Sequence, residues 1–244
     1  MRDSTLTRRR LLFAAGSGVL GVAVISSCSE APAPSPPPSP APPLPSSAPA
    51  AATPAWQRVN LSFVSAYLLI RGGETAVVDL GTDGSGAAIE AALKGAGTGW
   101  GSVKHILLTH QHPDHAGGLA SVIPEVNAAF YAGAADVAGI TSAKPLKPVQ
   151  DGDEVFGLQI IGTPGHTAGH ISVFDPSTGT LVAGDALRTT NGLEGSDPRY
   201  TADANQATAS VRKLAALDIK TILPGHGDPL TTGAADALRK LAGS

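Results

Sequence analysis

Three histidines and an aspartate fall within six residues of the sequence, in the segment "THQHPDHAG". Imidazole nitrogens and carboxylate oxygens are the donors that zinc, manganese and iron bind in proteins. His110 and His112 are two residues apart, so on an extended turn their side chains can point the same way. Asp114 and His115 follow Pro113 and can face a second position. The segment therefore predicts a metal-binding loop that can serve two neighbouring ions, between which a water loses its proton near neutral pH.

Three further motifs place a potential ligand directly after an apolar segment that we expect to be a strand. They are "IIGTPGH", which ends at His166, "LVAGD", which ends at Asp185, and "ILPGHG", which contains His226. Strand ends are rigid, and the turns that follow them can aim side chains into a shared cleft. We therefore expect these three residues to join the histidine-rich loop in one site.

The elements that must position these residues alternate between strands and helices. Two apolar segments around a glycine-containing turn predict a hairpin, and apolar residues at a helical period before a glycine predict a helix. We expect Thr201 to be the N-cap of the helix that follows it. The expected elements are hairpins at 65–70/75–80 and 170–175/180–185, strands at 103–110, 158–166 and 220–227, and helices at 86–97, 116–126, 201–217 and 234–243.

In this order and spacing, the motifs "HQHPDH", "GHTAGH", "AGD" and "PGHG" resemble the metallo-β-lactamase-fold hydrolase superfamily. The resemblance covers essentially all of residues 56–244, and four motifs in order are far more specific than any one of them. It implies an α/β fold, a four-layer αβ/βα sandwich of two mixed β-sheets with helices on the outer faces. By matching position it assigns ligands to a first metal, to a second metal and to a bridge between them: His110, His112 and His166; Asp114, His115 and His226; and Asp185.

The resemblance also implies the chemistry. The nucleophile would be a hydroxide held between two divalent ions, most simply zinc, although manganese or iron suits the same donors. Asp114 is the expected catalytic residue, which orients the nucleophile or carries a proton. His170 and Asp79 are expected to support ligands from behind or to form turns, and His105, inside a strand, is expected to be structural.

The substrate class follows less directly. True β-lactamases of this family usually lack the bridging aspartate, so Asp185 favours the esterase, thioesterase and lactonase branches. Full glyoxalase II enzymes carry a C-terminal helical region, whereas only 18 residues follow His226 here. We expect a metallo-hydrolase of a small ester, thioester or lactone. A β-lactam hydrolase and a non-catalytic metal-binding module are the alternatives.

Composition excludes one class of partner. The chain has 17 basic and 20 acidic residues, a net charge of −3, and no basic cluster in the predicted domain. We therefore expect a small-molecule substrate and no nucleic acid.

The first 55 residues differ from the rest. Residues 1–27 contain three successive arginines and then an apolar run, which indicates an export signal of the twin-arginine type. A plain secretory signal and a short transmembrane helix are the alternatives. The run ends in "ISSC", which resembles a bacterial lipobox and predicts a lipid on Cys28. Residues 28–55 are rich in Pro, Ala and Ser, which favours an extended disordered linker. The expected protein is thus an exported membrane lipoprotein whose catalytic domain spans 56–244.

Substrate specificity is the property about which the sequence says least. Residues 186–203 show no clear period and are expected to form a loop over the site. Arg188, Asn191 and Tyr200 are candidates for contact with substrate, but each is equally compatible with an ordinary loop residue.

Overall fold

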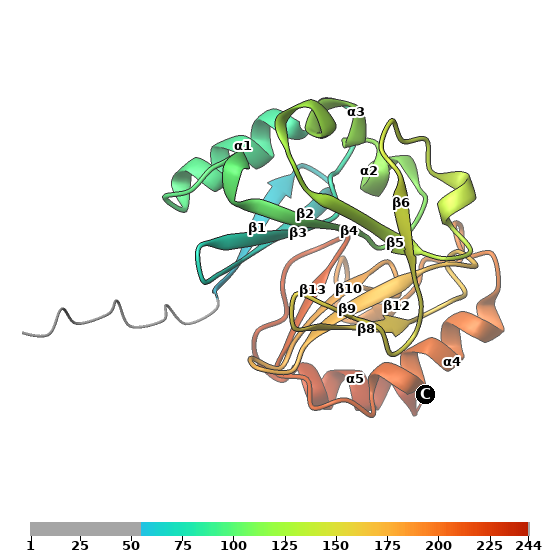
Figure 1. Cartoon of the computed structure of the whole chain (residues 1–244). Coiled ribbons are helices and arrows are strands. Elements are labelled where there is room, and N and C mark those ends of the chain that lie inside the picture. The colour runs from blue at the N-terminus through green and yellow to red at the C-terminus, as the bar shows by residue number, and fades with distance from the viewer. Residues whose placement is uncertain (1–54, 244) are drawn as a thin grey trace, which may run out of the picture. The chain divides into compact units, whose positions relative to one another are not determined.

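Two mixed β-sheets pack face to face in the computed structural model, which describes residues 55–243, and helices cover the outer face of each sheet (Figure 1). The first sheet contains, in spatial order, β1 (Ala55–Leu61), β2 (Val64–Arg71), β3 (Glu74–Val78), β4 (Val103–Leu108), β5 (Ala129–Gly133) and β6 (Leu146–Val149). The second contains β13 (Thr221–Pro224), β10 (Thr180–Gly184), β9 (Ile171–Asp175), β8 (Leu158–Gly162) and β7 (Glu154–Val155). A separate short hairpin joins β11 (Leu187–Arg188) to β12 (Glu194–Gly195).

Strand direction decides where the loops gather. In the first sheet β1, β2 and β3 pair antiparallel, and β3 to β6 pair parallel. In the second sheet β7 to β10 pair antiparallel, and β13 pairs parallel with β10. Strands β8, β10 and β13 therefore run the same way, and the loops after all three emerge at one edge of the sheet.

Helices cover the two outer faces. On the first sheet lie α1 (Gly86–Gly95), α2 (Pro113–Ala116) and α3 (Leu119–Val122), and on the second lie α4 (Ala204–Leu214) and α5 (Ala234–Ala242) (Figure 1). Three 3₁₀ turns complete the elements: η1 (Trp100–Ser102), η2 (Ile123–Glu125) and η3 (Val137–Gly139).

Apolar side chains form three separate cores, one between each pair of adjacent layers. Leu107 and Ile160 belong to the core between the two sheets. Ile89 of α1 belongs to the core between the first sheet and its helices, and Val211 of α4 to the core under the second sheet. Because both faces of each sheet are covered, strands such as β9 and β10 are buried at every position. This arrangement confirms the predicted four-layer sandwich.

Most predicted elements are present, but two details were wrong. The helix expected at 116–126 is broken, because the Gly118 N–H donates to the Gly81 carbonyl instead of continuing a helix. A Cβ at Gly118 would lie 2.3 Å from the Leu80 carbonyl oxygen, so only glycine allows this close contact. Thr201 is not the cap of α4. Asp203 is the N-cap, and its carboxylate accepts from the N–H groups of the first helical turn.

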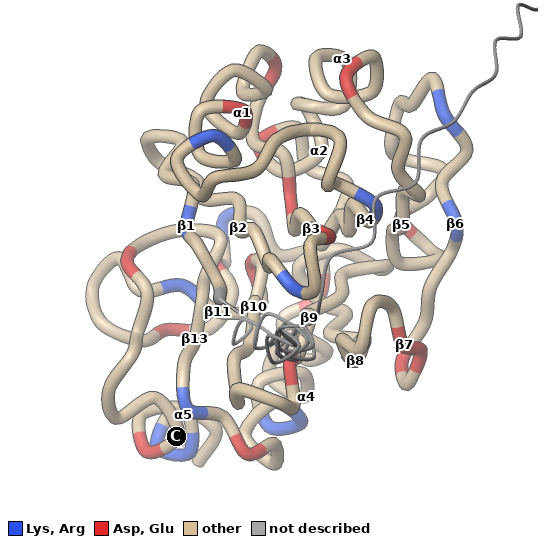
Figure 2. The backbone as a smooth tube through the Cα atoms, turned by 60° about the vertical axis from the view of Figure 1, so that its left-hand side comes forward, with Lys and Arg blue, Asp and Glu red and all other residues tan. Residues whose placement is uncertain are grey.

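The predictions for the N-terminal part of the chain concern residues that the structure does not describe. The export signal, the Cys28 lipobox and all but the last residue of the proline-rich segment lie outside the described residues. Within residues 55–243, no helix is long and apolar enough to cross a membrane. Over the same residues, Lys and Arg are spread along the chain among Asp and Glu (Figure 2).

Replacing Leu107 by alanine tests the core between the sheets. The side chain is fully buried, so its removal leaves a cavity and should lower the free energy of unfolding by about 2–5 kcal/mol in urea denaturation. Lys94→Ala on the exposed face of α1 is the control and should change it by less than about 0.5 kcal/mol. Equal losses in the two variants would contradict the three-core arrangement.

Candidate metal centre

Four loops from both sheets bring the predicted ligands to one edge of the sandwich. His110 lies two residues beyond β4 in the first sheet. His166, Asp185 and His226 follow β8, β10 and β13, whose ends lie at the same edge of the second sheet. The short helix α2 begins at Pro113, and its single turn carries Asp114 and His115. All seven residues assigned as ligands lie in these loops.

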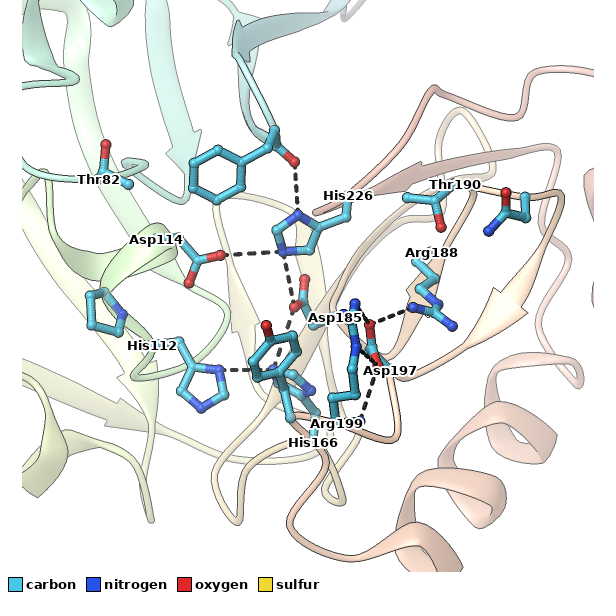
Figure 3. A pocket seen from close by; sticks show the side chains of 14 residues that line it. Thr82, His112, Asp114, His166, Asp185, Arg188, Thr190, Asp197, Arg199 and His226 are labelled. Carbon is cyan, nitrogen blue, oxygen red and sulfur yellow. Dashed lines mark hydrogen bonds and ion pairs between the residues drawn. The ribbon is translucent and has the colours of Figure 1, made fainter.

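Three imidazole nitrogens converge in a first group. His112 Nδ1 lies 3.1 Å from His110 Nε2 and 2.9 Å from His166 Nε2. These three residues form one of the groups within residues 55–243 that can hold a metal ion. His110 and His166 are buried, and His112 faces the pocket (Figure 3).

A second group lies beside the first, and Asp185 touches both. His226 Nε2 lies 3.3 Å from Asp114 Oδ2 and 3.5 Å from His115 Nε2. Asp185 Oδ2 lies 3.2 Å from His226 Nε2 and 3.4 Å from His166 Nε2, so it stands between the groups (Figure 3). The structure thus brings together all seven predicted residues. Which ion each would bind stays a prediction.

In three of these histidines, the ring nitrogen that points away from the centre is hydrogen-bonded to a group that determines which nitrogen carries the proton. His226 Nδ1 donates to the Phe63 carbonyl oxygen at 2.8 Å, since a carbonyl only accepts. His115 Nδ1 lies 2.8 Å from the Asp79 carboxylate. His110 Nδ1 lies 3.0 Å from Thr109 Oγ1, whose proton is already given to Asp79, so the hydroxyl accepts. In the neutral imidazole the opposite nitrogen then turns a lone pair toward the centre, as a metal ligand requires.

One contact is unfavourable without a cation or a proton. Asp185 Oδ1 is buried and accepts no hydrogen bond from any group among residues 55–243, yet it lies 3.2 Å from His115 Nε2. A carboxylate oxygen and an imidazole lone pair at this distance repel each other. Because the donors are also of the right chemical type, the residues fit bound divalent metal.

The pKa values also indicate that the carboxylates of the centre favour a positive charge beside them. Burial lowers the pKa of His166 to about 4 and that of His110 well below its ordinary value. Burial also disfavours charge on His115, but the carboxylates of Asp185 and Asp79 outweigh it and hold its pKa well above the usual range. For His226, hydrogen bonds to Asp114 and Asp185 outweigh burial and raise the pKa to about 10. The carboxylates therefore attract a proton in the place where a metal ion would bind.

Residues 59–226 match the metallo-β-lactamase superfamily. The chain belongs to this superfamily. It is 28% identical over 201 residues to a probable metallo-hydrolase of Bacillus subtilis (strain 168), covering 64% of this chain and 76% of that protein. It is 33% identical over 166 residues to hydroxyacylglutathione hydrolase of Acidiphilium cryptum (strain JF-5), covering 66% of this chain and 63% of the relative. A structure solved in a di-iron-bound form has a TM-score of 0.57 and 27% identity, covering 70% of this chain and 90% of that one.

Membership confirms the resemblance read from the motifs and makes the chain a metallo-hydrolase of the superfamily. His170 does not join the predicted ligands: its Nε2 accepts from the Asp185 N–H at 3.0 Å and so holds Asp185 from behind. Asp79 has a positive φ of 61° and accepts from the Thr109 N–H at 2.7 Å. His105 lies outside the centre and stacks on Phe156.

Two further features of this superfamily member carry no clear sequence signal. Asp136 is buried and accepts from the Gln111 N–H at 3.0 Å and from the Gly169 N–H and the Thr167 hydroxyl at 2.6 Å each. It therefore ties the loop after β4 to the loop after β8. Gly225 packs so closely that a Cβ would lie 2.3 Å from Asp185 Oδ1 and 2.6 Å from His115 Cε1, so a larger residue there would displace these candidate ligands.

A pocket of about 800 Å³ opens over the centre. Its lining includes Arg188, Asn191 and Tyr200, the three loop residues left open by the sequence. Phe63 and Tyr200, the two large apolar side chains most exposed within residues 55–243 at 60% and 61%, also line it. Phe63 stacks on the His226 ring, with the ring planes 8° apart. The pocket thus has aromatic groups beside the candidate ligands.

Changing Asp136 to asparagine tests the tie between the two ligand loops. The amide keeps one acceptor and places an NH₂ against donors, so the metal-free protein should lose about 1–3 kcal/mol of unfolding free energy. Asp153→Asn is the matched control and should lose less, because the half-buried Asp153 carboxylate accepts from one N–H. An unchanged urea midpoint in Asp136→Asn would mean that the carboxylate does not hold the loops.

Proposed function

We propose that the chain is a dinuclear metal hydrolase that cleaves a small ester, thioester or lactone outside the cytoplasm. The observation that carries the proposal is the contact at 3.2 Å between buried Asp185 Oδ1 and His115 Nε2, which is favourable only when a proton or a cation lies there. His115 and Asp185 also belong, with His110, to one of three groups of donors within residues 55–243 that could hold a metal ion, so bound cations would make this contact favourable.

The proposed ligands are those of the two groups. His110, His112 and His166 would hold one ion, Asp114, His115 and His226 the other, and Asp185 would contact both. Two bound divalent ions would supply an activated water near neutral pH and would stabilise the negative charge that develops on the substrate carbonyl. We propose zinc, and the di-iron-bound relative makes iron the main alternative.

Asp114 is the proposed catalytic carboxylate. Its side chain is 27% exposed and lines the pocket, whereas that of Asp185 is 12% exposed. It is therefore the carboxylate that a water beside the substrate reaches first. In the proposed reaction Asp114 orients the attacking water, takes its proton and returns it to the leaving alcohol or thiol.

The pocket supports a small substrate. Its volume of about 800 Å³ lies within the range for small-molecule sites, and Phe63 and Tyr200 offer apolar surface to an acyl or aromatic group. Thioesters are favoured among the candidates by the relation to hydroxyacylglutathione hydrolase. The chain spans 63% of that relative's length, so its substrate is carried over only as a class.

The place of action is proposed from the N-terminal sequence. Residues 1–27 would direct export, a lipid on Cys28 would anchor the protein, and residues 28–55 would hold the domain away from the membrane. At about 3.1 Å per residue, the 24 residues 31–54 could reach roughly 70 Å when fully extended.

Single substitutions of His112 and Asp114 by alanine test the metal mechanism. We expect each folded variant to lose bound metal and to hydrolyse esters at least about 100-fold more slowly, because one ligand of a group is removed. Metal content by mass spectrometry and thermal unfolding check binding and folding separately. His105→Ala removes a histidine outside the centre and should keep both metal and activity. Retained hydrolysis in both ligand variants would disprove the mechanism.

A substrate panel separates the candidate functions. The metal-loaded protein should turn over thioesters, lactones or small esters and should leave the β-lactam nitrocefin intact, because Asp185 is present. Clear nitrocefin turnover would instead establish the β-lactamase alternative. Tight metal binding measured by calorimetry, with no turnover of any substrate, would establish the non-catalytic module.

Changing Arg8 and Arg9 together to lysine tests the export route. A twin-arginine signal is read by a receptor, so the double variant should stay in the cytoplasm, which cell fractionation measures. Export at the normal level would disprove the twin-arginine assignment and leave a plain secretory signal.

A further inference from the structure

The loop between β12 and α4 contacts the pocket and a candidate ligand at the same time. Asp197, Arg199 and Tyr200 of this loop line the pocket. Ser196 of the same loop places its Oγ 2.9 Å from His166 Nδ1. Among the described ligands, His166 is thus the one whose outer nitrogen meets the pocket loop.

A chain of hydroxyl groups continues from this contact. Ser196 Oγ lies 2.6 Å from Thr201 Oγ1, and the Thr201 hydroxyl donates to the Asp197 carbonyl oxygen at 2.6 Å. A carbonyl oxygen can only accept, so Thr201 donates its one hydroxyl proton to it, and Thr201 Oγ1 must accept from Ser196. The Ser196 hydroxyl in turn donates to Thr201 Oγ1, so Ser196 Oγ must accept from His166 Nδ1. The direction of every bond is therefore set by the carbonyl at the end of the chain.

We propose that Ser196 and Thr201 are positioning residues that hold His166 in the tautomer protonated at Nδ1. His166 Nε2 then presents a lone pair to His112 and Asp185, 2.9 Å and 3.4 Å away. The hydroxyl chain consequently prepares His166 to bind a metal ion, although neither hydroxyl touches the centre.

The end of this chain is fixed by the pocket wall. The Asp197 carboxylate is bound by Arg188 and by Arg199, and it lies between them at the side of the pocket (Figure 3). The loop is also held against the backbone of His166, because the Ala202 N–H donates to the His166 carbonyl at 3.2 Å. His115 and His226 differ, because their Nδ1 atoms meet an acceptor directly, without intervening hydroxyls.

The tautomer is a property of the metal-free chain, and only its effect on catalysis rests on the proposed function. Nitrogen-15 NMR of the metal-free protein reports which nitrogen of His166 carries the proton. We expect Nδ1–H in the wild type and a mixture of tautomers in Ser196→Ala and in Thr201→Val. Thr201→Val is the decisive variant, because its side chain has nearly the same shape and the Thr201 hydroxyl is linked to His166 Nδ1 through the Ser196 hydroxyl.

Metal affinity gives a second measurement that does not depend on hydrolysis. In competition with a chelator, zinc affinity should fall about 10–100-fold in Ser196→Ala, and by about tenfold in Thr201→Val. Thr201→Ser, unlike Thr201→Val, keeps a hydroxyl at this position and should show the wild-type tautomer and zinc affinity. Thr208→Val on α4 is the matched control, since the Thr208 hydroxyl donates to the Ala204 carbonyl of its own helix and should change neither.

Two results would overturn the proposal. One is a wild-type His166 protonated at Nε2. The other is an unchanged tautomer and zinc affinity in both Ser196→Ala and Thr201→Val. A protein that shows the expected tautomers and affinities but hydrolyses no substrate would keep this proposal and contradict the proposed function.

Discussion

One buried carboxylate holds ligands of both candidate groups. Asp79 accepts from His115 Nδ1 and, through the Thr109 hydroxyl, fixes the proton of His110. It follows β3 directly, and it also accepts the Thr109 N–H after β4, so it joins two neighbouring strand ends. Because Asp79 is 2% exposed, these bonds form in a medium where an unpaired charge would be costly. The rest of the centre is built around the orientation that this residue imposes.

The sandwich explains why such a centre lies at an edge. The interior between the sheets is apolar and closed, so polar ligands can gather only where strands end. The same-direction strands β8, β10 and β13 each end in a turn at that edge, and β4 supplies the fourth loop from the facing sheet. Each loop then needs a tie to its neighbour, which His170 supplies for Asp185 and Asp136 supplies for the loops at 111 and 167–169.

The four-layer fold was predicted through the resemblance of four motifs to a known superfamily, and the residues that meet in the centre were predicted from the same motifs, which are local patterns. Ligands at fixed spacing after apolar strands remain readable without any knowledge of long-range contacts. Asp136 and Ser196 were not predicted, because each acts on a segment at least 25 residues away and sits in no recognisable motif. Thr201 was misread for a different reason: it and Asp203 are both good capping residues two positions apart, and only the backbone geometry decides between them.

The place of Thr201 in the pocket loop affects how substitutions can change the site. The loop at 186–203 forms much of the pocket wall, so a new substrate preference would be expected to arise there. In this chain the same loop also carries the hydroxyls that lead to His166. A substitution that reshapes the wall near Asp197 therefore moves the carbonyl on which the direction of the hydroxyl chain depends. The Nδ1 atoms of His115 and His226 meet their acceptors outside this loop, so such a change would alter the tautomer of His166 first.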